Sequence, residues 1–181
     1  MFIFKKTKLR HFQTRNCTKT YDIMEIATFI INYCAETNRA INNLYLQKLL
    51  YFVYAFFITE TTEKKPLFKS RMEAWAFGPA FPEVYYEFQH YLEAKIEYQN
   101  TYRTMTSVCP IEYNKNNIEQ RDREIIMFII DKYRHHSLGE IVFLTQSQDP
   151  WSEAFGFGGS STPKIITDKM IKNYFICHQQ A

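Results

Sequence analysis

Two adjacent imidazoles, on His135 and His136, are the side chains of this chain best suited to proton transfer at neutral pH. A histidine acts as a general base only when a nucleophile lies within hydrogen-bond reach. No sequence motif places such a nucleophile beside this pair, which directly precedes a helix-start signal at Ser137. We therefore interpret the two histidines as a solvated pair and predict no catalytic residue.

A glycine-rich segment, Gly156 to Ser161, is the stretch that could cradle a phosphate group. It lacks the Gly-Lys-Ser/Thr ending of a phosphate-binding loop, and the residues before it show a helical pattern instead of a strand pattern. The motifs GxSxG and HExxH of hydrolases and zinc proteases are absent as well. The sequence thus predicts no enzyme and no cofactor, and it leaves a small hydrolase or nucleotide-binding enzyme as the least favoured class.

The cysteines form no close-spaced pair of the kind that is typical of a structural zinc site. They are scattered along the chain: Cys17, Cys34, Cys109 and Cys177. The alternative is a metal site built from Cys177, His178 and either His135 or His136, but the spacing of these residues favours free thiols and no metal. With no secretory signal in the sequence, we expect a protein of the reducing cytoplasm.

The charge of the chain is unevenly distributed. Residues 1–20 contain basic side chains and no acidic one: Lys5, Lys6, Lys8, Arg10, Arg15 and Lys19. A solvated basic extension is the favoured interpretation of such a block, and contact with nucleic acid or an acidic partner is the alternative. An organellar transit peptide and a translation start at Met24 also stay open.

The rest of the chain, residues 21–181, is expected to form one domain, since its length and its 46% hydrophobic content suffice for a core without disulfides. Apolar residues in 43–59 follow a helical face and continue on its flanks, which predicts a buried central helix that starts at Asn43. Lys48 interrupts this apolar run, so no segment is long enough to span a membrane. Lys48 and Gln47 are interpreted as surface positions of that helix, where Lys48→Ala would change stability little; a polar contact from Gln47 to the adjacent turn is the competing interpretation.

Further elements follow from the same patterns. A strand is predicted at Met72 to Phe77, a rigid turn at Gly78-Pro79, and a helix from Pro82 to Glu93. Helical segments are also predicted at residues 23–37, 119–134, 137–146, 149–155 and 167–176, with a loop from Gly156 to Pro163. In residues 94–117, Tyr98, Tyr102 and Val108 are interpreted as a second short strand or an irregular segment, with turns at Pro110 and at Asn114 to Asn117. The expected fold is therefore mainly α with a small β element: a compact single domain of about six helices.

Several of these segments resemble the Panacea or SocA-like antitoxin domain. The resembling residues are Asn43-Leu44, Gln47 to Phe52, Glu73 to Trp75, Phe77 to Pro79, Pro82 to Tyr85, Leu144-Thr145, Asp149 to Trp151, and Ile171 with Tyr174-Phe175. Their order and spacing extend over nearly the whole chain. Gln47, Leu49, Leu50, Tyr51, Phe52 and Trp151 are the motif residues to which the resemblance gives a structural role.

The resemblance implies an antitoxin that neutralises a cognate toxin by direct protein binding, in a bacterial, phage or mobile-element setting. It also implies that delivery of the toxin to a protease, with a protease or chaperone partner, is a second mode of action. A nucleic-acid-binding regulator that uses the basic extension is the alternative function. Where the family often has a histidine, this chain has Gln146; an amide has no pKa near neutrality, so we expect a structural hydrogen bond at this position.

A partner-binding surface is predicted around the strand, the turn and the helix that follows. Its candidate residues are Trp75, Phe77, Gly78, Pro79, Pro82, Tyr85 and Tyr86. The competing interpretation is that Trp75 fills the core while the Gly-Pro pair shapes the corner. Helical spacing directs Val84, Phe88 and Leu92 inward and leaves Tyr86 and His90 outward, and tyrosine is favoured at protein interfaces.

Overall fold

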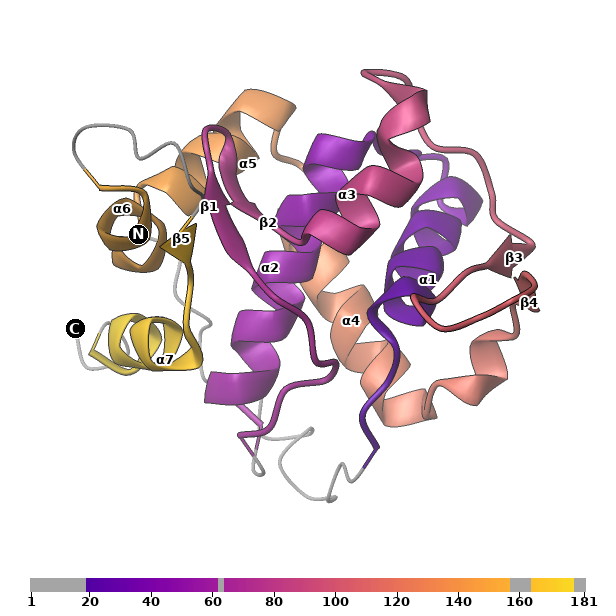
Figure 1. Ribbon diagram of the computed structural model, residues 1–181, viewed down its shortest axis with the longest axis horizontal. Helices are drawn as coiled ribbons and strands as arrows, with labels where there is room; N and C mark the ends of the chain where they lie inside the picture. Colours follow the sequence, from indigo (N-terminus) through magenta and orange to yellow (C-terminus); the bar gives the residue numbers. More distant parts are fainter. Residues whose placement is uncertain (1–18, 62–63, 157–163, 178–181) are drawn as a thin grey trace.

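The computed structural model describes residues 19–61, 64–156 and 164–177, and it is mainly helical (Figure 1). Within the described residues there are seven α-helices: α1 (Ile23–Glu36), α2 (Asn43–Thr59), α3 (Pro82–Phe88), α4 (Gln120–Tyr133), α5 (Leu138–Gln146), α6 (Asp149–Phe155) and α7 (Asp168–Cys177). The predicted fold class is confirmed. The glycine-rich loop at 157–163, His178 and most of the basic extension lie outside the described residues.

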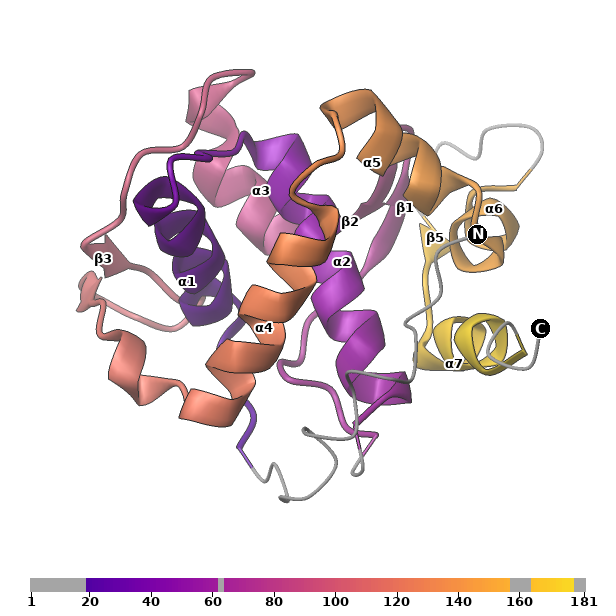
Figure 2. The same cartoon turned by 180° about the vertical axis from the view of Figure 1, so that it is seen from behind.

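Helix α2 is the centre of the molecule. It passes through the middle of both views, and it packs on α1, α3, α4, α5 and α7 (Figures 1 and 2). Every residue from 46 to 59 is buried, so the helix has no solvent-facing stripe. Its N-cap is Asn42, whose side chain accepts a hydrogen bond from the Tyr45 amide at 2.9 Å; the predicted cap, Asn43, is instead the first helical residue and is buried.

The start of the domain is fixed by Tyr21 and Asp22. The Asp22 side chain caps α1 by accepting a hydrogen bond from the Met24 amide at 2.8 Å. The buried Tyr21 donates its hydroxyl proton to Asp122 and accepts a hydrogen bond from the Glu119 amide. A chain that began at Met24 would lack both anchors.

A three-stranded antiparallel sheet, ordered β2-β1-β5, lies against α2, α5 and α6. Its strands are β1 (Glu73–Trp75), β2 (Gly78–Ala80) and β5 (Lys164–Ile165). Because Trp75 pairs with Gly78, the turn of the β1–β2 hairpin is Ala76-Phe77, and the prediction of a turn at Gly78-Pro79 is wrong. Proline is tolerated in β2 because β2 is an edge strand, where a missing amide proton breaks no ladder bond.

The helix after the hairpin is shorter than predicted. Helix α3 ends at Phe88 and passes into a 3₁₀ turn, η2 (Gln89–Tyr91). Leu92 then adopts a φ of +52° and is 81% exposed, so its predicted core position is wrong, whereas Val84 and Phe88 are buried as expected. The change of helix type rotates the chain after Phe88, and the helical spacing no longer applies.

Residues 94–117 form a second, smaller hairpin at the side of α1 (Figure 1). It consists of β3 (Thr101–Tyr102) and β4 (Ile111–Glu112), followed by a 3₁₀ turn, η3 (Lys115–Asn117). Tyr102 therefore lies in a short strand, whereas Tyr98 and Val108, which the sequence pattern groups with it, do not. Among the described residues, no helix is both long and apolar enough to cross a bilayer.

Candidate partner-binding site

The β1–β2 hairpin is attached to the helical body by three side-chain hydrogen bonds to its own backbone and by a fourth to Phe81, the residue that follows it. Lys48 of α2 donates to the Pro79 carbonyl at 2.9 Å, and Gln47 accepts from the Phe81 amide at 2.8 Å. Gln146 of α5 donates to the Ala76 carbonyl at 2.8 Å, and Trp151 of α6 donates to the Trp75 carbonyl at 2.9 Å. We call these four side chains the hairpin clamp. They fix the position of a hairpin whose own ladder is only three residue pairs long.

Lys48 is the most unusual member of the clamp. It is 1% exposed, and no carboxylate of the described residues forms an ion pair with it. Burial lowers the pKa of its ammonium group to about 7, because the charged form loses its hydration. The interpretation of Lys48 and Gln47 as surface positions is therefore wrong: the sheet, α3 and α5 cover the side of α2 on which they lie.

Gly78 allows the hairpin to approach Lys48 closely. A Cβ atom at this position would lie 2.7 Å from Thr145 Oγ1 and 2.9 Å from Lys48 Nζ, and the φ of Gly78 is +100°. Both the contact distance and the backbone angle exclude a side chain. The Gly-Pro pair is thus needed for packing beneath the surface, since Gly78 and Pro79 are both buried.

Gln47 extends the clamp to α3 through Asn43. The Gln47 amide donates to Asn43 Oδ1 at 3.0 Å, and Asn43 Nδ2 donates to the Tyr85 carbonyl at 2.9 Å. The competing interpretation is a polar contact from Gln47 to the adjacent turn; the contact observed is instead to the Phe81 amide, one residue after β2. Sequence reasoning missed Asn43, although its spacing of four residues from Gln47 places both side chains on one helical face.

The motif residues with an expected structural role are buried, apart from the half-buried Trp151. Leu49, Leu50 and Tyr51 are fully buried, and the Tyr51 hydroxyl donates to Gln148 Oε1 at 2.6 Å, which joins α2 to the start of α6. Phe52 stacks on Tyr133 of α4 with a centroid distance of 4.0 Å. Gln146 makes the structural hydrogen bond that its amide predicted, from a half-buried position.

Aromatic side chains of the hairpin and of α3 reach the surface. We call Trp75, Phe77, Tyr85 and Tyr86 the aromatic rim. Phe77 in the hairpin turn is 64% exposed and Tyr86 is 57% exposed. Trp75 is half-buried and lies edge-on to Tyr85 at 4.8 Å and tilted to Tyr86 at 6.2 Å, so it belongs both to the packed body and to the surface.

The seven predicted partner-binding residues therefore divide into two groups. Trp75, Phe77, Pro82, Tyr85 and Tyr86 reach the surface to different degrees, whereas Gly78 and Pro79 support them from inside. His90 is exposed as expected. The histidines considered first lie elsewhere, between α4 and α5, where His136 contacts the Tyr133 carbonyl.

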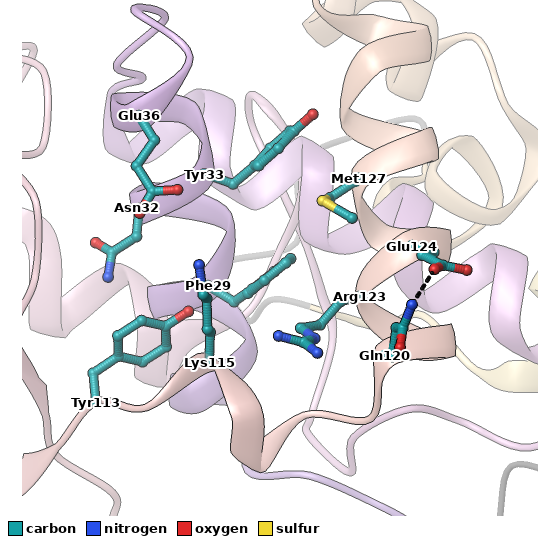
Figure 3. A pocket seen from close by; sticks show the side chains of 10 residues that line it. All are labelled: Phe29, Asn32, Tyr33, Glu36, Tyr113, Lys115, Gln120, Arg123, Glu124 and Met127. Atoms are coloured by element: carbon teal, nitrogen blue, oxygen red, sulfur yellow. Dashed lines mark hydrogen bonds between the residues drawn. The ribbon is translucent and has the colours of Figure 1, made fainter.

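A separate pocket of about 330 Å³ lies between α1, η3 and α4 (Figure 3). Phe29 and Tyr33 of α1 and Met127 of α4 supply apolar walls, and the cationic side chains of Lys115 and Arg123 also line it. None of the predicted site residues lies in this pocket. Among the described residues, no group of three or more His, Cys, Asp or Glu side chains is arranged to hold a metal ion.

The segment that contains the hairpin and the clamp matches a known protein family. Residues 46–152 match the family described as Antitoxin SocA-like, Panacea domain. Antitoxin SocA of Caulobacter vibrioides (strain NA1000 / CB15N) is 37% identical over 67 residues, which are 37% of this chain and 35% of that protein. The match thus spans about a third of the length of this curated relative. No solved structure matches the chain.

Proposed function

The chain belongs to the family of SocA-like antitoxins that share the Panacea domain, and from this premise we propose that it is the antitoxin of a toxin–antitoxin pair. In this proposal it neutralises a cognate toxin by direct, non-covalent binding, and the toxin docks on the aromatic rim. Neutralisation then results from covering or distorting the toxin, with no covalent chemistry.

The aromatic rim is the observation that supports this surface. Tyrosine and tryptophan are enriched among the residues that dominate binding energy, because they offer large contact areas with few rotatable bonds. The hairpin clamp holds the rim in place before a partner arrives, so little conformational entropy is lost on binding. Phe77 and Tyr86 then offer apolar surface to a partner on a supported frame.

Co-expression with the small gene next to its own tests the proposal, with bacterial growth as the readout. The wild-type chain should restore growth and should co-purify with the toxin. A double variant, Tyr85→Ala with Tyr86→Ala, should bind the toxin about 30-fold more weakly, because a hot-spot residue contributes about 2 kcal/mol. Circular dichroism should show that this variant keeps its fold.

Tyr98→Ala is the matched control, since Tyr98 is 44% exposed and lies outside the rim. It should restore growth as the wild type does. Undiminished rescue by the folded Tyr85/Tyr86 variant would move the docking surface away from the rim, and the 97–117 region would be the next candidate.

Delivery of the toxin to a protease is an alternative way in which an antitoxin of this family could act. Binding alone leaves the toxin at a constant level, whereas delivery shortens its half-life in cells that hold the protease. Pulse-chase labelling of the toxin, with and without this chain, separates the two modes. The Tyr85/Tyr86 variant should affect either mode, since both begin with docking.

A further inference from the structure

The sequence segment that carries the aromatic rim has no basic side chain. Residues 72–94, which hold the hairpin and α3, contain no lysine or arginine, and all 22 basic residues of the chain lie elsewhere. The same segment carries carboxylates: Glu73, Glu83, Glu87 and Glu93. Residues 137–156 of α5 and α6 continue this pattern with Glu140, Asp149 and Glu153 and no basic residue.

Cations border the 72–94 segment without lying in it: Lys95 follows it and Lys164 pairs with Ala74 across the sheet, and both are exposed. Lys48 reaches under the hairpin, but it is buried and bound to the Pro79 carbonyl. Arg71, just before the segment, pairs with Glu73 at 2.8 Å. In contrast, Glu87 and Glu93 are exposed, and Glu87 directly follows the exposed Tyr86 on α3. The outer surface of this segment therefore combines aromatic faces with negative charge.

We propose that the aromatic rim accepts a basic segment of its protein partner, in which arginine or lysine side chains alternate with apolar ones; this inference rests on the proposed function. Guanidinium and ammonium groups are attracted to the faces of tryptophan and tyrosine as well as to carboxylates. The apolar side chains of the partner cover Phe77. The negative field speeds the encounter with a basic partner and repels nucleic-acid phosphates.

Synthetic peptides that carry the expected chemistry of the partner test this inference. A 12-residue peptide that alternates arginine and leucine is titrated into the ¹⁵N-labelled chain at about 50 mM salt, where exposed charges are weakly screened. It should shift the amide signals of residues 73–93 and the Trp75 indole signal. A twin peptide with glutamate in place of every arginine should leave them unchanged.

Charge reversal gives the matched variants. Glu87→Lys with Glu93→Lys should weaken binding of the arginine peptide roughly three- to tenfold, because two attractions become repulsions. Glu36→Lys with Glu112→Lys carries the same change in net charge on exposed residues of α1 and β4, away from the hairpin in both overall views (Figures 1 and 2). This control should bind the peptide nearly as the wild type does.

Equal shifts from both peptides, or equal weakening by both double variants, would overturn the inference, as would rim signals that shift with a single-stranded DNA oligonucleotide. The two proposals fail in different ways. Growth that is not rescued, combined with selective binding of the arginine peptide at the rim, contradicts the antitoxin function alone. Toxin binding that depends on Tyr85 and Tyr86 but not on Glu87 and Glu93 contradicts the basic partner alone.

Discussion

Lys48 is the residue whose environment differs most from its usual one. A lysine in the middle of an apolar helix normally marks the side that faces water, yet here the hairpin covers it and the Pro79 carbonyl accepts a hydrogen bond from it. Keeping a charged group in this position costs free energy, because the group loses its hydration. The ammonium group therefore loses its proton more readily, which is why its pKa is lowered.

This environment predicts a pH dependence of stability. The pKa of Lys48 is about 7 in the folded chain and 10.5 in the unfolded one, so between these values the unfolded state binds more protons. The free energy of unfolding should therefore rise from pH 7 to pH 9, by up to about 1.4 kcal/mol per pH unit from this group, whereas below pH 7 the contribution stays at its minimum. Urea unfolding of the wild type and of Lys48→Met at pH 7, 8 and 9 measures this pH dependence.

Lys48→Met removes the titrating group and keeps most of the volume. The free energy of unfolding of the wild type, measured relative to that of the variant, should therefore increase as the pH rises from 7 to 9. Parallel curves for the two proteins would show that Lys48 has an ordinary pKa and that water reaches it.

Gly78 offers a second test at the scale of one residue. Gly78→Ala should lower the free energy of unfolding by about 2–4 kcal/mol, because the methyl group meets Lys48 and Thr145 at a backbone angle that alanine rarely adopts. Gly139→Ala is the control, since nothing lies within 4 Å of its Cβ position on α5, and it should stabilise the chain by up to about 1 kcal/mol. Thermal melts of both variants decide whether close packing makes Gly78 necessary.

At the scale of elements, the hairpin depends on helices that are distant in the sequence. Its β1–β2 ladder covers three residue pairs, and a two-stranded hairpin is marginally stable by itself. Side chains from α2, α5 and α6 bind its backbone, and β5 adds a third strand. The hairpin is therefore expected to keep its conformation only while these helices are packed.

Gln47→Met should loosen this attachment. It leaves the buried Phe81 amide and Asn43 Oδ1 without their partner, at an expected cost of about 2–4 kcal/mol, and hydrogen exchange of the Phe81 amide should become much faster. Gln146→Met removes one bond to the same hairpin from a half-buried position, where water can replace it, and should cost less than about 1 kcal/mol. Similar exchange rates for Phe81 in both variants would contradict the role of Gln47.

At the scale of the molecule, the domain is closed at its N-terminal end by Tyr21 and Asp22. Lys19, which belongs to the expected basic extension, also contacts the body, since its ammonium group donates to the Asn117 carbonyl at 2.6 Å. The boundary between extension and domain is thus expected just before Lys19, slightly earlier than the predicted position after residue 20.

Deletion of residues 1–18 should leave the melting temperature within about 2 °C of the wild type and should remove any salt-sensitive affinity for nucleic acid. Deletion of residues 1–22 should cost at least about 3 kcal/mol, because it also removes the Asp22 cap and the buried Tyr21 ring. Calorimetry of the two truncated chains makes the comparison. A large loss of stability in the shorter deletion would place the domain boundary further upstream.

Features that depend on local interactions could be predicted from the residues alone. Ser137 and Glu140 form the capping box that their spacing predicts, and Asp149-Pro150 starts a short helix. The apolar run of α2 identified a buried central helix. Each of these signals is contained within a few neighbouring residues, and the family resemblance rests on the same short motifs.

What covers each face of these elements, in contrast, depends on contacts between distant segments. Helical periodicity cannot show that Lys48 is buried, because α2 is surrounded on all sides and the hairpin that covers Lys48 begins 25 residues later. The pairing of β1 with β5 joins segments about 90 residues apart, and no local pattern encodes it. Leu92 is exposed because the chain changes helix type after Phe88. Whether a residue is buried depends on contacts with segments that are distant in the sequence, so only the folded structure of the whole chain determines it.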